Sequence, residues 1–159
     1  MIIGGKEFDT ENNTYIMGIL NVTPDSFSDG GKYNNMDAAL RHAEQMIQEG
    51  ADILDVGGES TRPGHMQITD EEEAERVVPV IRALKKEFDV PVSVDTYKST
   101  VAEAALEAGA DLVNDIWGLK YDPGMAAVIA GHDAACCLMH NRINTEYENF
   151  LADFMEDMK

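Results

Sequence analysis

Residues 21–31 read NVTPDSFSDGG and follow an apolar run, residues 15–20. The run predicts a buried strand, and Asn21 would lie at its carboxyl end. The Asn21 amide could coordinate a hard cation through oxygen or hold a phosphate through nitrogen; the alternative is a simple strand-end cap. The loop after it is either an ordinary surface loop or a lid over a substrate, with Phe27 as its stacking element.

A second polar loop, GGESTRPG at residues 57–64, follows the apolar run 53–56. Arg62 is the only cation that we expect at these strand ends, and a guanidinium group suits an anionic oxygen. A surface salt bridge to one of the many acids is the alternative. The neighbouring Thr61 and the polar ends of two strands favour anion binding.

Three apolar runs in succession end in carboxylates or an amide. These residues are Asp55, Asp95, Asn114 and Asp115. Because the carboxyl ends of parallel strands lie at one edge of a sheet, their side chains would converge on one pocket. They could hydrogen-bond the donor-rich edge of a heterocycle and stabilise positive charge that develops on it. The alternative is that each Asp caps the next helix.

Other site chemistries find little support in the sequence. No Cys/His spacing is typical of zinc, no glycine-rich loop matches a Walker motif, and no Ser/His/Asp grouping can be argued. For His140, at the end of the fifth strand, ligand contact and a plain strand end both remain open. Cys136 and Cys137 fall in an apolar run, which favours a buried strand over a disulfide and fits a reducing cytoplasm.

The charge balance limits the partners. Twelve Lys and Arg against 30 Asp and Glu give the 159-residue chain a net charge of -18. Binding to nucleic acid or to an anionic membrane is therefore not expected. An anionic substrate would need a bound cation or a local Arg or Lys. With no apolar segment of signal-peptide or membrane-spanning length, the protein is expected to be cytoplasmic.

Strand-like and helix-like patterns alternate along the chain, which favours a parallel sheet. Strands are expected over residues 15–20, 52–56, 91–95, 111–116 and 134–140, and helices over 36–47, 69–88, 99–108, 125–130 and 147–158. A hairpin with Asn12 and Asn13 near its turn would precede them. Capping boxes are expected at Thr69 with Glu72 and at Thr100 with Glu103, and Pro79 should bend or split its helix.

These patterns make five βα units in a single domain over residues 1–159. A (β/α)8 barrel has eight strands and usually about 250 residues, so the chain would form only its first five units. A five-stranded open sheet of the flavodoxin type fits the length better.

The strings NVTPDSFSDGG, DVGGESTRPG, SVDT, NDI and LMHNR, in this order, resemble the dihydropteroate synthase family of pterin-binding enzymes. The resemblance implies an incomplete TIM-type (β/α)8 barrel. It also implies a transferase of folate biosynthesis that joins 6-hydroxymethyl-7,8-dihydropterin diphosphate to p-aminobenzoate and releases diphosphate.

The resemblance assigns roles by motif position. Asn21 would contact the diphosphate and its Mg²⁺, and Thr61 and Arg62 would hold the diphosphate. The predicted pterin contacts are Asp55, Asp95 and Asn114, with Ile116 and Met139 packing on the ring, and the predicted p-aminobenzoate contacts are Phe27 and Pro63. Asn21, Arg62 and Asp95 are the expected catalytic residues. Mg²⁺ and Arg62 would neutralise the leaving diphosphate before the arylamine attacks.

The family also uses an Asp, a Lys, an Arg and a His on strands beyond the fifth, and the sequence ends at Lys159 before any of them. The chain is therefore expected to be an N-terminal piece, or to receive these strands from a partner, with little or no synthase activity alone. Open sheet edges favour a homodimer. Two alternatives are a methyltetrahydrofolate-dependent corrinoid methyltransferase and a non-catalytic pterin-binding fragment.

Overall fold

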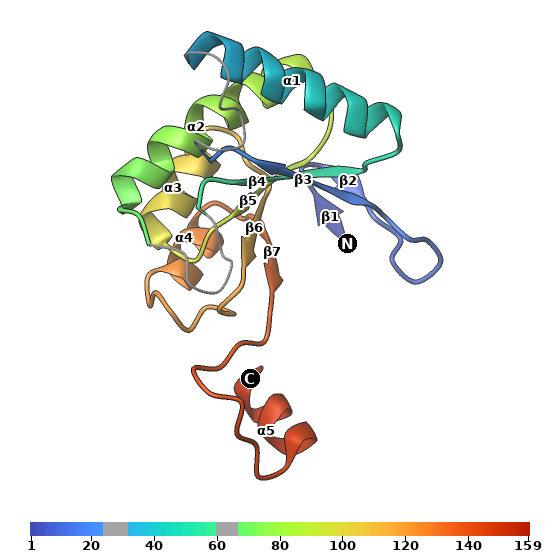
Figure 1. Ribbon diagram of the computed structural model, residues 1–159. Coiled ribbons are helices and arrows are strands. Elements are labelled where there is room, and N and C mark those ends of the chain that lie inside the picture. Colours follow the sequence, from blue (N-terminus) through green and yellow to red (C-terminus); the bar gives the residue numbers. More distant parts are fainter. Residues whose placement is uncertain (24–31, 60–66) are drawn as a thin grey trace.

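A five-stranded parallel sheet forms the centre of the computed structural model, which describes residues 1–23, 32–59 and 67–159 (Figure 1). Its strands are β3 (Met17–Asn21), β4 (Ile53–Gly57), β5 (Val92–Asp95), β6 (Leu112–Asp115) and β7 (Ala135–Leu138), and they are adjacent in chain order. A flavodoxin-type sheet would instead place the first strand between the second and the third. The observed order is that of consecutive strands in a barrel wall, which excludes the open-sheet alternative.

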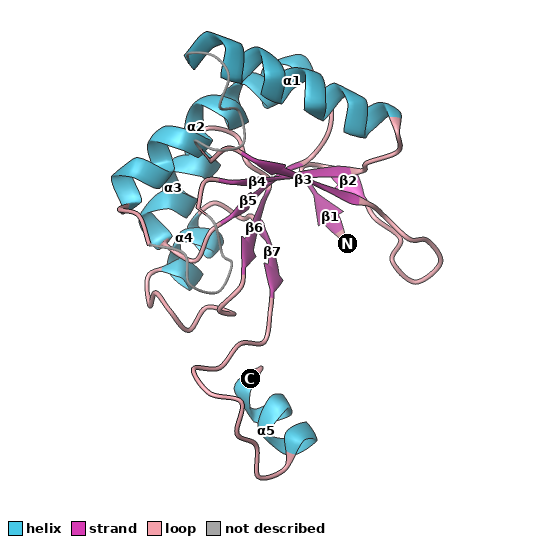
Figure 2. Cartoon of the chain, in the orientation of Figure 1, coloured by secondary structure: helices cyan, strands magenta, loops and turns pink. Residues whose placement is uncertain are grey.

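Four helices cover one face of this sheet: α1 (Lys32–Gln48), α2 (Asp70–Glu87), α3 (Ser99–Glu107) and α4 (Met125–Gly131) (Figure 2). Alternate strand residues such as Leu54, Val94 and Val113 are fully buried beneath them. Because successive side chains of a strand point to opposite faces, the residues between these positions face away from the helices. We call this second side of the sheet the inner face.

The amino-terminal end of the inner face is covered by a hairpin of β1 (Ile2–Ile3) and β2 (Lys6–Glu7). Ile3 and Phe8 form a small core there with residues of β4 and β6. The hairpin turns at Gly4 and Gly5, whose φ angles are 56° and 76°. The hairpin turns there because two successive left-handed residues strongly favour glycine. The chain also turns at residues 10–12, where the Asn13 N–H donates to the Asp9 carbonyl oxygen at 3.0 Å, so a turn near Asn12 and Asn13 is present, although it does not join β1 to β2.

The helix starts agree with the sequence patterns only in part. Thr69 caps α2 as predicted, since its hydroxyl accepts the Glu72 N–H at 3.2 Å. Pro79 lies inside α2, which is continuous, so the predicted split is wrong; one missing N–H is offset by the burial of the surrounding apolar face. The capping box at Thr100 is also wrong. The first N–H of α3, from Ser99, instead donates to Asp122 Oδ2 at 2.8 Å.

The two edge strands are more exposed than their apolar composition predicts. Ile19 on β3 is 64% exposed, and Cys136 and Cys137 on β7 are exposed free thiols, so the prediction that both strands are buried is wrong. Among the described residues, each edge strand is hydrogen-bonded to a neighbouring strand on one side only. The last helix, α5 (Phe150–Asp157), lies beyond β7 and apart from the other helices (Figure 1). No described helix is long and apolar enough to cross a membrane.

Candidate functional site

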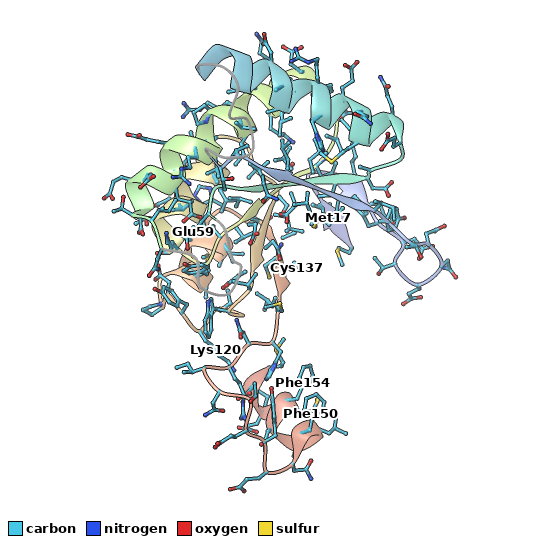
Figure 3. All side chains as sticks on the ribbon, viewed as in Figure 1. Met17, Glu59, Lys120, Cys137, Phe150 and Phe154 are labelled. Carbon is cyan, nitrogen blue, oxygen red and sulfur yellow. The ribbon has the colours of Figure 1, made fainter. Side chains whose placement is uncertain are left out.

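The strand register brings several predicted site residues into one row. Asn21 pairs with Gly57, Gly57 with Asp95, Asp95 with Asn114, and Asn114 with Cys137. Paired residues of parallel strands point to the same face, so this row lies on the inner face at the carboxyl ends of the strands. Two residues earlier along β4, Asp55 points to the same face. Cys137, on β7, is labelled in Figure 3.

Asp55 and Asn114 are in direct contact. The Asn114 Nδ2 donates to Asp55 Oδ2 at 3.0 Å. The Asp55 side chain is almost completely buried, and its Oδ1 has no hydrogen-bond partner. Burial raises the pKa of Asp55, and the hydrogen bonds that it accepts oppose this rise. A buried carboxylate oxygen without a partner is an unsatisfied acceptor, and an N–H donor from a ligand would satisfy it.

Asp95 has the same feature. Its Oδ1 is buried without a partner. Burial, together with the negative charges of Asp55, Glu73 and Asp115, raises the pKa of Asp95 to about 7. The site therefore contains two carboxylates that each keep one buried oxygen without a hydrogen-bond partner. Perturbed carboxyl groups at strand ends are typical of ligand sites.

Gly57 separates Asn21 from Asp95. A Cβ atom at Gly57 would lie 3.3 Å from Asn21 Oδ1 and 3.5 Å from Asp95 Oδ2. A side chain at position 57 would therefore fill the space between the Asn21 amide and the Asp95 carboxylate. The glycine leaves room there for a ligand.

The other predicted site residues that the structure describes differ in burial and in the face of the sheet to which they point. Ile116 follows β6 and is partly buried, and Met139 follows β7 and is 47% exposed. Asp115 points away from the inner face and accepts the N–H groups of Trp117 and Leu119 at 2.8 Å each. Its carboxylate therefore holds the turn after β6, and the prediction that it lines the pocket is wrong.

His140 also has a structural partner. Its Nε2 lies 2.8 Å from Asp157 Oδ2, and Arg142 Nε donates to the same oxygen at 2.6 Å. Arg142 and His140 hold the pKa of Asp157 near 2 through these hydrogen bonds. The cluster ties the end of β7 to α5.

Sequence reasoning missed a buried ion cluster beside the site. Lys98 Nζ lies 2.7 Å from both Glu59 Oε2 and Glu73 Oε2 and donates to the Ile68 carbonyl oxygen at 2.8 Å. The Tyr97 hydroxyl donates to Glu59 Oε1 at 2.6 Å. Arg62 is therefore not the only cation near the strand ends. A signal was available, because Glu73 stands one helical turn before Val77 on the apolar face of α2, where an acid needs a buried partner.

Four predicted residues lie outside the described residues: Phe27, Thr61, Arg62 and Pro63. Their roles stay predictions.

Comparison with known proteins places the chain in a family. Residues 17–159 match the family described as pterin binding enzyme. The chain belongs to this family. A dihydropteroate synthase of Clostridium beijerinckii is 62% identical over 159 residues, which are 100% of this chain and 59% of that protein.

Solved structures agree with this assignment. A dihydropteroate synthase from Clostridium difficile, solved in the presence of pteroic acid, has a TM-score of 0.87 and 53% identity over 96% of this chain and 61% of its own. A Xanthomonas albilineans dihydropteroate synthase with 4-aminobenzoic acid has a TM-score of 0.81 and 41% identity over 92% of this chain and 56% of its own. This member of the pterin binding family thus spans about three fifths of the length of these relatives, and its fold is part of their barrel.

Proposed function

We propose that this chain carries the pterin-binding part of a dihydropteroate synthase. The enzyme would condense 6-hydroxymethyl-7,8-dihydropterin diphosphate with p-aminobenzoate to give 7,8-dihydropteroate and diphosphate. The observation that carries the proposal is the pair of unpartnered carboxylate oxygens, Asp55 Oδ1 and Asp95 Oδ1, beside the Asn114 amide on the inner face. The relatives named dihydropteroate synthase and the solved structures with pteroic acid and 4-aminobenzoic acid support it.

The chemistry of a pterin suits these groups. A pterin ring presents an amino group and ring N–H groups along one edge, and ionised carboxylates accept hydrogen bonds from them. Asp55, Asp95 and Asn114 would hold that edge, while Ile116 and Met139 would pack on the ring. When the bond to diphosphate breaks, positive charge develops on the pterin methylene group, and the negative charge of Asp95 would stabilise it.

The residues at the end of β3 also suit a magnesium ion. Asn21 is exposed, and its amide oxygen and an Asp95 oxygen both lie near Gly57; oxygen atoms are the ligands that Mg²⁺ prefers. Within the described ranges, no three His, Cys, Asp or Glu side chains are grouped so that they could hold a metal ion. We therefore propose that Asn21 and the substrate diphosphate hold Mg²⁺ together, with Thr61 and Arg62 binding the same diphosphate. The bound ion would neutralise charge on the leaving group.

Phe27 and Pro63 are proposed to border the p-aminobenzoate. Asn21, Arg62 and Asp95 would be the catalytic residues. The leaving diphosphate could take the proton that the attacking amine loses, so that no protein group would be needed as a general base. The homodimer and the cytoplasmic location stay predictions.

Binding of pteroic acid to the chain tests the pterin site. Isothermal titration calorimetry should give saturable binding. Asp95→Ala and Asn114→Ala should each weaken it at least about tenfold, since each loses hydrogen bonds to a charged or buried group. Asp89→Ala is the matched control, because the Asp89 side chain is 99% exposed and should leave binding unchanged. Absence of binding by the wild-type chain would contradict the proposed function.

One further candidate keeps support from a specific observation. Asp55 Oδ1 and Asp95 Oδ1 could accept hydrogen bonds from a pterin whether or not a reaction follows, so a pterin-binding protein without turnover is the second proposal. Pteroic acid binding would favour this second proposal if no turnover occurred even when the rest of the barrel was supplied as a second polypeptide. The corrinoid methyltransferase is disfavoured because the relatives found are named dihydropteroate synthase.

A further inference from the structure

The buried ion cluster connects segments that lie far apart in the sequence. Lys98 belongs to the loop after β5, Glu59 and Ile68 to the connection between β4 and α2, and Glu73 to the first turns of α2. The side chains of Lys98, Glu59 and Glu73 are only 2–4% exposed. Tyr97 adds a hydrogen bond to Glu59 and is also buried. One ammonium group therefore has three oxygen partners and joins two neighbouring strand ends to the helix above them.

The same segments carry the row of site residues. Lys98 stands three residues after Asp95, and Glu59 stands two residues after Gly57. The Gly57 carbonyl oxygen accepts the Val22 N–H at 2.9 Å, which connects the end of β4 to the residue after Asn21. The Thr96 N–H donates to the Asn114 carbonyl oxygen at 3.1 Å, which connects the end of β5 to β6. A movement of either loop would thus change the positions of Asp95 and Asn114.

We propose that Lys98 is a positioning residue for pterin binding: by holding Glu59, Glu73 and Ile68 together, it fixes the carboxyl ends of β4 and β5 so that Asp95 and Asn114 face the ligand. This inference rests on the proposed function of the inner face. Lys98 itself does not contact the ligand, because its ammonium group is enclosed by the cluster.

The energetics of buried ion pairs give a reason to look for a role beyond stability. Among the described residues, the carboxylates of Glu59 and Glu73 share the ammonium group of Lys98 in a buried place. Replacing a buried ion cluster by apolar residues is often neutral or stabilising, so stability alone does not account for it. Buried ion clusters with several fixed partners do restrict the arrangement of the segments that they join, and the segments joined here carry the site.

The test compares three single variants by pteroic acid titration, at a temperature where near-ultraviolet circular dichroism shows each to be folded. Lys98→Met should weaken binding at least about tenfold, because displaced Asp95 and Asn114 side chains would lose one or two hydrogen bonds to the ligand. Tyr97→Phe, which removes only the hydrogen bond to Glu59, should weaken it about threefold. Lys85→Met is the matched control, because Lys85 makes a 2.7 Å ion pair with Asp111 at the opposite end of the sheet. It should lower stability and leave binding within about twofold.

A second readout separates positioning from general stability. Hydrogen exchange should become faster at residues 57–59 and 95–98 in Lys98→Met and stay unchanged there in Lys85→Met. Wild-type affinity in folded Lys98→Met would overturn the inference. If Lys98→Met does not fold, wild-type affinity in Tyr97→Phe overturns it instead. Failure of the wild-type chain to bind pteroic acid is a different result, since it counts against the proposed function itself.

Discussion

At the scale of single residues, Asp95 combines an unsatisfied oxygen with a strongly raised pKa. Its Oδ1 has no partner, and burial and neighbouring negative charges raise its pKa to about 7. Asp55 differs from Asp95 because it accepts a hydrogen bond from the amide of Asn114, which lies 59 positions later in the sequence. The sequence allowed Asp95 to be predicted as a ligand contact because a single Asp ended an apolar run. The pKa could not be predicted, because it depends first on burial in the folded protein and then on the charges of Asp55, Glu73 and Asp115, which come from other elements.

The raised pKa predicts that Asp95 lowers stability at neutral pH. In the folded protein the Asp95 carboxyl keeps its proton up to about pH 7. In the unfolded chain it loses the proton near its ordinary pKa of 3.8. The unfolded state is therefore favoured progressively as pH rises from about 4 to about 7. Asp95→Asn should be more stable than wild type by about 1–2 kcal/mol at pH 8 and should differ little from it at pH 4. The value at pH 8 is smaller than the full pKa shift would give, because the Asp95 carboxyl is partly exposed to solvent. Urea unfolding at both pH values measures this, and Asp89→Asn should show no such pH dependence.

The same carboxyl predicts the pH dependence of ligand binding. Only the ionised form of Asp95 accepts two ligand N–H groups, so pteroic acid affinity should rise between about pH 6 and pH 8 and then level off. In Asp95→Asn the affinity should be lower and independent of pH over this range. Titration calorimetry in a buffer series measures both proteins. An equal rise in the variant would show that another group, on the protein or the ligand, causes it.

The two adjacent cysteines offer an internal control for the position of the site. Cys137 lies in the row with Asn114, whereas Cys136 pairs with Val113 and points to the opposite face. Both are exposed, and burial raises the pKa of Cys137, which slows its reaction with maleimide. In Cys136→Ser, pteroic acid at a concentration well above its dissociation constant should slow the labelling of Cys137 at least about fivefold, because most sites are then occupied. It should not protect Cys136 in Cys137→Ser. Mass spectrometry follows both labelling rates, and equal protection would contradict the register argument.

At the scale of helices and strands, the periodic apolar patterns predicted every strand of the sheet and the helices between them. They succeeded because each helix packs an apolar face on alternate strand residues, so that local sequence and tertiary packing agree. Helix α3 shows where local patterns fail. Thr100 with Glu103 has capping-box spacing, yet the cap comes from Asp122, 23 residues after Ser99. A contact over that distance leaves no periodic trace in the sequence.

The cap of α3 therefore predicts different outcomes for two substitutions. Asp122→Ala removes the acceptor of the Ser99 and Gly124 N–H groups and should cost about 1–2 kcal/mol. Thr100→Ala, at an exposed position, should cost less than about 0.5 kcal/mol. The Ser99 N–H lowers the pKa of Asp122, so the stability that Asp122 contributes is present at neutral pH and is lost as pH falls through its folded pKa. Urea unfolding of both variants at pH 7 tests this. Because the Thr100 hydroxyl also donates to Asp70 Oδ2, the decisive result is the loss in Asp122→Ala, and an unchanged stability of that variant would contradict the assigned cap.

At the scale of the whole molecule, the predicted arc of five βα units is confirmed, and its edges explain the wrong burial predictions. Apolar residues such as Ile19 and Leu138 lie on the edge strands and are partly exposed. Phe150 on α5 is 64% exposed and lies away from the sheet (Figure 3). The sequence shows which residues are apolar, but burial also requires a covering element.

This arrangement predicts how synthase activity can be obtained. The chain alone, with both substrates and Mg²⁺, should give no turnover above background, because its inner face lacks the opposite wall of a closed barrel. A second polypeptide with the rest of the Clostridium beijerinckii relative should restore turnover when mixed with it, since parallel strands would pair with the open edges of β3 and β7. A steady-state assay of diphosphate release measures this. The matched control replaces the chain by its Asp95→Ala variant, which offers the same edges without the site carboxylate and should leave the mixture inactive. Normal turnover by the chain alone would show that five βα units suffice.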